Sequence, residues 1–478
     1  MKTECETEKM QFQASGPRKV EGHFDGGYLS SDGGVILLGE VEEKLDIVGR
    51  FSRCFSDYRD PSWVEHPLEA LIQQRVFGIA QGYEDLNDHD ALRNDGMLAL
   101  ACGKSDPTGQ DRRLERDRGK TLAGKSTLNR LELGSAERGP LHPYKKVILS
   151  PERVDDLLLE LFCESQRKLD CAPKELIIDL EATGDPLHGE QEGRFFKAYY
   201  DCYCYLPLDI FCGDHLLLAR LQTSDVDPAQ EGMDASQQVV RKLRRAGPKT
   251  WIIIRGDSGF SNNELMDFCE TTPLVDYIFG QAQNSRLEKL IETEMAEAKA
   301  AFEETDETSK VYSEFQYQTR NSWSRKRRII AKAEDIKKGA NPRFLVTSLT
   351  TLKFGKVPPR ALYEKLYCAR GDMENRLKEQ QLGLFADRTS IPYIKSNQVR
   401  LFFSSIASTL LRAMREYGLK GTKLAKAQCW TIRNRLLKVA VQVRFSVRRI
   451  KLSFPTAYIE KNTMFQILKQ VQTIPLRI

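Results

Sequence analysis

The sequence predicts an α/β protein whose core is a mixed β-sheet, preceded by a mainly helical region and followed by a basic segment. The first observation is a pair of short apolar runs, at 175–180 and 251–254, which have the length and composition of buried strands. The second is an amphipathic helical pattern at 234–245 between them, followed by a helical segment at 262–270 and a strand-like segment at 275–279. Strands that alternate with helices in this way are typical of an α/β layer around one sheet.

The length and composition indicate a globular protein with several structural units. The chain has 478 residues, of which 41% are hydrophobic and 29% are charged, and a chain of this length folds into about two to four units. Its best candidate for a membrane span, Leu401 to Leu411, is shorter than the roughly 20 apolar residues that cross a bilayer. The eleven cysteines include no Cys-x-x-Cys pair, and the N-terminus lacks the apolar core of a secretory signal. These features predict a reduced, cytoplasmic location.

Residues 1–165 are predicted to form a mainly helical region. Apolar residues recur at helical spacing in 33–45, 69–80 and 153–169. The polar segments between them are rich in glycine and aspartate, which predicts loops.

The core is expected in two parts, 166–285 and 353–418, separated by a mainly β insertion at 286–352. In the first part, 194–205 and 216–222 predict two further strands. The insertion begins with a charged helical stretch and continues with segments that alternate like strands, at 311–319, 328–333 and 343–348. Helices are predicted to resume after the insertion, at 359–384 and 397–417.

Two aspartates stand within or directly after the predicted buried strands. Asp179 lies at the end of the first apolar run, and Asp257 follows the second. Burying an ionised carboxylate costs free energy unless something compensates its charge, and a divalent metal does so directly. A single aspartate after a strand is more often a turn or helix cap than a ligand, and Glu181 and Asp185 are nearby alternatives to Asp179.

A third acid, Glu374, lies in a predicted helix after the insertion. Tyr367, Arg370, Glu374 and Lys378 recur every three or four residues and therefore share one helical face. This face offers a metal ligand between two cations, which suits a phosphate group beside a metal ion. The same spacing is also that of ordinary ion pairs on a solvent-facing helix, so spacing alone leaves both interpretations open.

The last segment, 419–478, is predicted to contact nucleic acid. From 417 to 459 the chain carries ten lysines and arginines and no acid, interleaved with aromatic side chains, a composition that suits a phosphate backbone. A solvated basic face without a specific partner is the alternative. The residues predicted to contact DNA here are Arg433, Arg435, Arg444, Arg448, Arg449 and Lys451.

The segment from Gly119 to Ser126 matches the phosphate-binding pattern G-x-x-x-x-G-K-[ST]. That pattern binds a nucleotide only where a buried strand leads into the loop, and the preceding residues 111–118 (DRRLERDR) are not strand-like. We therefore predict a basic loop and helix start at which Lys125 contacts DNA, and no nucleotide cofactor. The histidines do not combine with cysteines at zinc spacing, although His188 and His215 flank the first strands.

At these residues the chain resembles the DDE transposases related to insertion sequence 1380, within the insertion-sequence-4-like class. The stretch 193–214 (GRFFKAYYDCYCYLPLDIFCGD) is especially specific. The other similar segments are 80–93 (AQGYEDLNDHDALR), 122–132, 177–205, 255–260 (RGDSGF), 275–280 and 367–379. Together they extend over most of the chain.

The resemblance implies a ribonuclease-H-like catalytic core interrupted by a β insertion, with a helical N-terminal region for DNA binding and dimerisation. By motif, Asp179, Asp257 and Glu374 would be the three catalytic, metal-binding acids. The resemblance also implies cut-and-paste transposition of an insertion sequence, by in-line displacement at phosphorus with two Mg²⁺ ions, for which Mn²⁺ can substitute.

The class pattern Tyr-x2-Arg-x3-Glu-x6-Lys is met here in three of its four places. Tyr367, Arg370 and Glu374 match it, whereas Gln381 stands where the class has lysine. Lys378, one turn after Glu374, is the alternative cation.

The implied partners are double-stranded DNA, as inverted-repeat ends and as target, and a second copy of the chain in a synaptic homodimer. A nucleoid-associated location follows from DNA as substrate, and no membrane is expected. Two other functions remain open at this level. One is a ribonuclease-H-like nuclease that does not join strands, and the other is a catalytically inactive, repurposed DNA-binding protein.

Overall fold

The computed structural model describes residues 9–134, 144–167, 173–352 and 355–475, and its largest sheet has nine strands. Hydrogen-bonded neighbours follow the order β11-β10-β6-β12-β13-β17-β15-β14, and β16 (Gly339–Ala340) pairs with β15. The bounds are β6 Glu175–Ala182, β10 Leu208–Cys212, β11 His215–Arg220, β12 Trp251–Gly256, β13 Val275–Gln281, β14 Ser309–Tyr317, β15 Arg327–Ile336 and β17 Arg343–Thr347. The predicted mixed sheet is confirmed, since β6, β12 and β13 run parallel while the other neighbours are antiparallel.

One expected strand is not part of this sheet, and one strand was not predicted. The segment 194–205 forms β8 (Phe195–Lys197) and β9 (Cys202–Tyr205), which pair with β7 (Asp185–Pro186) in a separate small sheet. The place beside β6 is taken by β10, in which Asp209 interrupts an apolar run. An acid in the middle of the run hides the strand pattern, because it breaks the continuous apolar stretch typical of a buried strand.

Side chains of β12 alternate between two buried faces of the sheet. Ile252 and Ile254 pack in the cluster that contains residues of α8 (Pro228–Ala246) and α9 (Asn263–Thr271). Ile253 packs on the other face with Leu362 and Leu366. A strand covered on both sides needs no polar positions, which explains its continuous apolar run.

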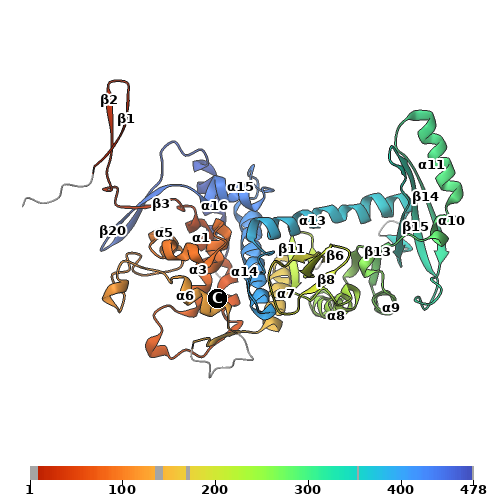
Figure 1. Ribbon diagram of the computed structural model, residues 1–478, viewed down its shortest axis with the longest axis horizontal. Coiled ribbons are helices and arrows are strands. Elements are labelled where there is room, and N and C mark those ends of the chain that lie inside the picture. Colours follow the sequence, from red (N-terminus) through yellow and green to blue (C-terminus); the bar gives the residue numbers. More distant parts are fainter. Residues whose placement is uncertain (1–8, 135–143, 168–172, 353–354, 476–478) are drawn as a thin grey trace, which may run out of the picture.

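The insertion extends the core sheet instead of forming a separate body. β17 pairs antiparallel with β13, with Ile278 opposite Thr347, and β15 and β14 continue outward from it. The charged helical stretch is α10 (Ser285–Lys289) and α11 (Glu292–Thr305), and α11 packs against β14 and β15. In Figure 1 these elements form the far right end of the molecule.

A nearly continuous helical run follows the insertion and crosses the sheet. It comprises α12 (Pro359–Ala361), the π-helical turn η6 (Leu362–Tyr367), the 3₁₀ turn η7 (Cys368–Arg370), α13 (Gly371–Lys378) and the π-helical turn η8 (Glu379–Gly383). Figure 1 shows this run reaching from the insertion to the N-terminal helices. Single π-helical turns inside helices are frequent at functional sites.

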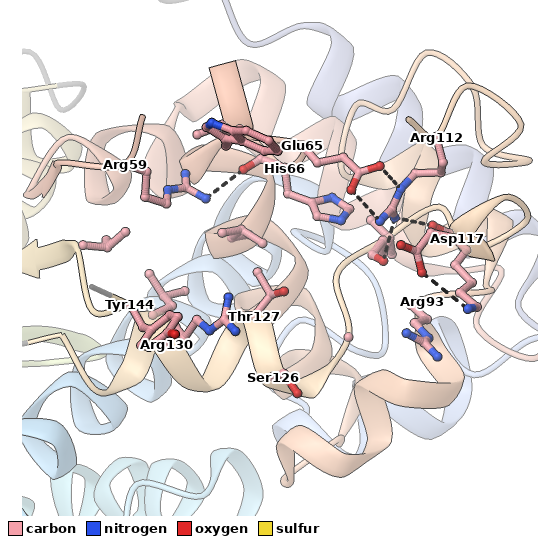
Figure 2. Close-up of a pocket in the computed structure, with 18 of the residues that line it drawn as sticks. Arg59, Glu65, His66, Arg93, Arg112, Asp117, Ser126, Thr127, Arg130 and Tyr144 are labelled. Atoms are coloured by element: carbon pink, nitrogen blue, oxygen red, sulfur yellow. Dashed lines mark hydrogen bonds and ion pairs between the residues drawn. The ribbon is translucent and has the colours of Figure 1, made fainter. Parts of the chain in front are cut away.

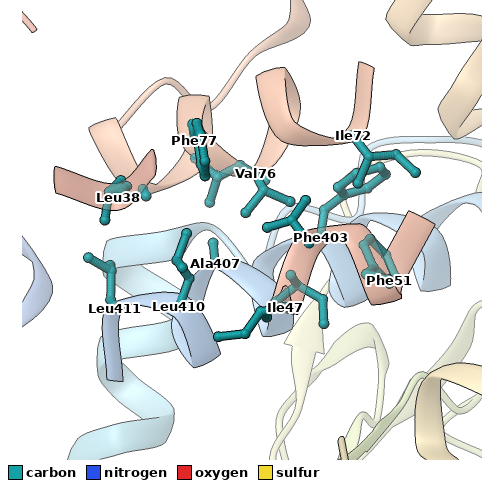
Figure 3. Close-up of a cluster of buried hydrophobic side chains, with 14 of the residues drawn as sticks. Leu38, Ile47, Phe51, Ile72, Val76, Phe77, Phe403, Ala407, Leu410 and Leu411 are labelled. Atoms are coloured by element: carbon teal, nitrogen blue, oxygen red, sulfur yellow. The ribbon is translucent and has the colours of Figure 1, made fainter. Parts of the chain in front are cut away.

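The N-terminal helices share one core with two helices from the end of the chain. The predicted helices are present as α1 (Val35–Leu45), α3 (Leu68–Gln81) and α7 (Pro151–Arg167), together with α2 (Ile47–Ser52), α5 (Gly96–Ala101) and α6 (Lys125–Glu132). They pack around α14 (Ile394–Ala413) and α16 (Lys461–Gln472). Phe51 and Phe403 pack edge to face within this cluster (Figure 3), with ring centroids 5.4 Å apart.

The apolar run 401–411 lies inside α14 and is buried in this core. It packs against α1, α2 and α3. Within the described ranges, no helix is both long enough and apolar enough to span a bilayer.

The basic segment after residue 419 folds back onto the N-terminal helices. It contains α15 (Cys429–Ile432) and the hairpin β20 (Val441–Ser446) and β21 (Arg449–Ser453), and β20 pairs with β3 (Tyr28–Ser30). The described residues of the N-terminal region and of 419–475 therefore build one body. A second hairpin, β1 (Met10–Ser15) with β2 (Arg18–Gly22), projects from this body (Figure 1).

Candidate active site

Asp179 and Asp257 stand on neighbouring parallel strands. Asp179 lies in β6 and pairs in register with Arg255 of β12, and Asp257 follows β12 directly. Asp257 caps the 3₁₀ turn η5 (Ser258–Phe260), where its Oδ1 accepts the N–H of Gly259 at 2.9 Å. Asp257 thus does cap a helical turn, as the alternative interpretation of the sequence predicted. Its Oδ2 does not take part in the cap and can bind another ligand.

Arg255 connects the three elements that carry the predicted acids. Its Nε donates to Asp179 Oδ1 at 2.5 Å and its Nη2 to Asp179 Oδ2 at 2.8 Å. Its Nη1 donates to the carbonyl oxygen of Leu366, in the helical run that leads to Glu374. Asp179 and Arg255 are 2% and 5% exposed, so the pair is shielded from water. Sequence reasoning missed Arg255, although it precedes Asp257 in the RGDSGF segment.

Arg370 links two carboxylates on the same side of the sheet. It donates from Nη1 to Glu374 Oε1 at 2.8 Å and from Nη2 to Glu181 Oε2. Burial lowers the pKa of Arg370, but the charges of Glu181, Asp257 and Glu374 outweigh burial and raise it overall. Three acids from β6, the end of β12 and α13 therefore act on one guanidinium. The i, i+4 pair between Arg370 and Glu374, which sequence spacing allowed, is present and belongs to this cluster.

The site carries an excess of buried negative charge. Burial raises the pKa of Asp179 and of Glu181, against the opposing effect of the arginines, and Glu374 raises both further. Asp209 pairs in register with Glu181, and burial raises its pKa to about 7, with Glu181 adding to the effect. Its Oδ1 is buried and has no hydrogen-bond partner within the described residues. Asp209 was not predicted, although the cost of an acid in an apolar run would have identified it.

Tyr367 lies against the loop that carries Asp257. A Cβ atom placed on Gly280 of β13 would lie 2.8 Å from the Tyr367 hydroxyl and 2.8 Å from the Ser258 nitrogen. Only glycine leaves room for this close approach. Burial raises the pKa of Tyr367, so its hydroxyl stays protonated and can donate a hydrogen bond.

The remaining acid and histidine alternatives lie away from this cluster. Asp185 is in the small sheet, where burial raises its pKa to about 7 and Thr389 is its hydrogen-bond partner. His188 is exposed, and His215 packs edge-on against Phe162. Lys378 is exposed on α13.

The carboxylate oxygens of this cluster are suitable ligands for a hard divalent cation, although the carboxylates do not converge on one point. In the part of the chain that the structure describes, no three His, Cys, Asp or Glu side chains converge closely enough to hold a metal ion. The reason is visible in the contacts, since Arg255 and Arg370 stand among the carboxylates. All the ligating atoms would be oxygens, which suits Mg²⁺, and the unpartnered Asp209 oxygen is consistent with a site short of positive charge.

A model of the family described as transposase DDE domain group 1 matches residues 12–476, nearly the whole chain. The chain belongs to this family. Among solved structures, a piggyBac transposase in a synaptic complex with hairpin DNA is similar over 84% of this chain and 80% of its own, with 12% sequence identity and a TM-score of 0.40. A comparison with curated proteins found no match.

Two arginines of this transposase that were predicted to contact DNA bind the protein itself. Arg433 donates from Nε to the carbonyl of Ala80 at 3.0 Å and from Nη2 to the carbonyl of Gly383 at 2.6 Å. These donors give Arg433 a structural role, and its contact with DNA stays a prediction. Arg435 forms an ion pair with Glu460, and 48% of its side chain is exposed, so its contact with DNA also stays a prediction.

The other predicted contacts of the basic segment face solvent. They lie on the β20–β21 hairpin or its turn and are Arg444, Arg448, Arg449 and Lys451. The turn residue Val447 is fully exposed as well. The hairpin is thus an exposed basic surface anchored through β3, and contact with DNA stays a prediction.

Lys125 of the transposase begins α6, and no strand precedes its loop. The chain before it forms the 3₁₀ turn η3 (Glu115–Asp117). The Nζ of Lys125 lies 3.5 Å from Oδ2 of Asp90. The residues that follow it, Ser126 and Thr127, line a cavity of about 610 Å³.

We call this cavity the basic cavity, because seven cationic side chains and four carboxylates line it (Figure 2). The cations are Arg59, Arg93, Arg112, Arg116, Lys120, Arg130 and Lys146, and the acids are Asp60, Glu65, Asp90 and Asp117. His66 also lines it, and burial, together with the charges of Arg112 and Lys104, lowers its pKa to about 4. The histidine is therefore neutral at pH 7.

Proposed function

We propose that this chain catalyses cut-and-paste transposition of an insertion sequence, by phosphodiester hydrolysis and strand transfer at terminal inverted repeats. The observation that carries the proposal is the approach of Asp179, Asp257 and Glu374 on one side of the core sheet, through Arg255 and Arg370. The strand order β11-β10-β6-β12-β13, antiparallel on one side of β6 and parallel on the other, supports a ribonuclease-H-like core.

DDE transposases generally use divalent metal ions, and we assign the ligands here to Asp179, Asp257 and Glu374, with Glu181 as a further carboxylate. Two Mg²⁺ ions, or Mn²⁺ in their place, would supply activation of the attacking oxygen and stabilisation of the leaving oxygen. Each Asp179 oxygen accepts one hydrogen bond from Arg255 and keeps a second lone pair for a ligand.

The chain's own residues orient the acids and place positive charge beside them. Arg255 holds Asp179 in one orientation, and its bond to the Leu366 carbonyl fixes the helical run over the strand ends. Arg370 offsets the charge of Glu181 and Glu374, and phosphate oxygens of the substrate would compete for the same donors. Tyr367, packed against the Asp257 loop, positions that acid.

The partners we propose are double-stranded DNA, as inverted-repeat ends and as target, and a second copy of the chain that holds the other end. Membership of the group related to insertion sequence 1380 is part of this proposal. The match to the class pattern at Tyr367, Arg370 and Glu374 supports it, and Gln381 in place of lysine is the departure.

A strand-transfer assay tests the function. Linear DNA that carries the inverted repeats flanking the gene is incubated with the protein, Mg²⁺ and a supercoiled target plasmid. We expect cleavage at the ends and joined product, and we expect Asp257→Ala and Glu374→Gln to abolish both, since the metal ligands would be lost.

Glu264→Ala is the matched control, because Glu264 is an exposed acid at the start of α9. This variant should keep full activity. Cleavage without joining would favour the nuclease hypothesis, and binding without cleavage would favour a repurposed DNA-binding protein. Normal cleavage by Asp257→Ala would show that the site assignment is wrong.

A further inference from the structure

The described lining of the basic cavity carries more positive than negative charge, with seven cations and four carboxylates. Arg130 stacks over Tyr144 at 5.4 Å, and Arg93 is the C-cap of α4 (His89–Leu92). Within the described residues neither side chain forms an ion pair, and the buried Nε of Arg93 has no hydrogen-bond partner. A buried donor without a partner is destabilising, so an acceptor from outside the chain would stabilise this arrangement.

The four acids of the cavity are already engaged within the protein. Glu65 accepts two hydrogen bonds from Arg112, at 2.6 and 3.0 Å, and Asp117 lies 3.5 Å from Lys120. The two other acids accept backbone N–H groups, Asp60 from Ser62 and Asp90 from Lys125. The backbone N–H of Lys125, and after it the charges of Lys125 and Arg93, lower the pKa of Asp90, so Asp90 offsets part of the charge of Arg93. Four carboxylates against seven cations still leave the lining with a net positive charge.

The first turn of α6 adds to the positive character of the cavity. Its N-cap residue, Gly124, has no side chain, and Asp90 Oδ1 accepts the N–H of Lys125 at 3.1 Å. A Cβ atom on Gly124 would lie 3.0 Å from Oδ1 of Asp90 and 3.1 Å from Nη1 of Arg93, so a carboxylate and a guanidinium both stand at this end of the helix. An anion beside Ser126 would interact with the positive end of α6 and with this guanidinium.

We propose that the basic cavity binds backbone phosphates of double-stranded DNA, at a place distinct from the acid cluster. Figure 2 shows Arg93 and Arg130 on either side of Thr127, along one wall of the cavity. Cations spread along a wall suit successive phosphates of one strand, whereas a nucleotide would need the compact cradle that is missing here. The inference rests on DNA being the substrate of the proposed function, and it gives the N-terminal helices a defined contact with that DNA.

The test measures affinity for a duplex of about 30 base pairs in EDTA, where no cleavage occurs, over a series of KCl concentrations. Fluorescence anisotropy is recorded for the full-length wild type, Arg93→Ala, Arg130→Ala and Arg93→Lys. Arg241→Ala is the matched control, since it removes one exposed arginine from α8, outside the cavity. Thermal unfolding of each variant establishes that it is folded.

We expect Arg93→Ala and Arg130→Ala each to reduce the slope of log K against log [KCl] by about 1 and to weaken binding about equally for different sequences. Arg93→Lys should keep most of the slope, because it keeps the charge. Unchanged slopes in both alanine variants, or an equal loss in Arg241→Ala, would overturn the proposal. If Arg93→Ala does not fold, Arg130→Ala and Arg93→Lys still decide it.

Two further arms separate DNA from small phosphate ligands. ATP and inorganic phosphate at millimolar concentration should neither raise the melting temperature of the wild type nor displace DNA at matched ionic strength. If ATP stabilises the wild type but not Arg93→Ala while DNA affinity is the same in both, the cavity is a nucleotide site and the proposal is wrong. Because the assay contains no metal, an inactive acid cluster would leave its result unchanged.

Discussion

At the scale of single residues, the candidate site depends on the two arginines that stand among its acids. Arg255 places Asp179 and the helical run before Glu374 in one hydrogen-bonded unit. Arg370 brings Glu181 into the same neighbourhood as Glu374. Removing one partner of a buried pair leaves an uncompensated charge, which costs far more than the pair contributes as a whole. Arg255 is thus a positioning residue, and its effects on folding and on metal binding can be separated.

We expect Arg255→Ala to lower the free energy of unfolding by about 3–5 kcal/mol, because Asp179 would remain buried without a counter-charge. Arg255→Lys should be destabilised less, since lysine keeps the positive charge but cannot form the bidentate hydrogen bond to Asp179. Urea denaturation measures both, and Mn²⁺ affinity by electron paramagnetic resonance should fall in the folded lysine variant. If Arg255→Lys binds Mn²⁺ as tightly as the wild type, Arg255 does not position Asp179. Arg325→Ala, which removes a half-exposed arginine, is the control variant.

At the scale of elements, the distance between β13 and the helical run determines where Asp257 lies. Gly280 is the point of closest approach, because the hydroxyl of Tyr367 and the backbone of Ser258 fill the space that a side chain would need. The backbone atom cannot rotate away, so any substitution must move the loop. Gly371, at the start of α13, has open space around its Cβ position.

We expect Gly280→Ala to reduce DNA cleavage at least about tenfold, because misplacing reacting groups by a fraction of an ångström or more is costly. Gly371→Ala is the contrasting variant, and it should raise stability by about 0.4–1 kcal/mol, since its helical backbone suits alanine. Cleavage rates under single-turnover conditions and thermal unfolding measure the two effects. Equal cleavage by Gly280→Ala and wild type would show that this contact does not position Asp257.

At the scale of the whole molecule, the basic C-terminal segment serves two purposes. Its first part is structural, because Arg433 donates to carbonyl oxygens of α3 and η8 and thereby joins the N-terminal helices to the helical run. Its second part is the exposed hairpin, whose arginines point to solvent. The same charge pattern in sequence therefore has two roles, which a pair of substitutions separates.

We expect Arg433→Ala to lower the free energy of unfolding by about 1–3 kcal/mol, because buried carbonyl oxygens lose their donors. Arg448→Ala should leave stability unchanged and reduce the salt dependence of DNA affinity by about one unit of slope. Urea denaturation and anisotropy titrations on both proteins provide the comparison. A stability loss in Arg448→Ala, or a loss of salt slope confined to Arg433→Ala, would reverse these assignments.

The sequence by itself determined the mixed sheet, the extent of the insertion strands and the helices around 33–45, 69–80 and 153–169, because each depends on local periodicity. It also singled out Asp179 and Asp257, since an acid in or after an apolar strand needs a compensating partner, and Glu374, which shares a helical face with Tyr367 and Arg370. It did not predict β10, in which Asp209 breaks the apolar run.

Only the tertiary structure decided which partners those acids have. Arg255 and Asp179 are 76 residues apart in sequence, and Arg370 and Glu181 are 189 apart, so no local pattern pairs them. The same holds for Arg433, whose sequence neighbours indicate an exposed basic segment while its acceptors lie about 350 and 50 residues away. Local periodicity records which face of an element is buried, whereas the choice of partner across that face depends on how distant elements pack.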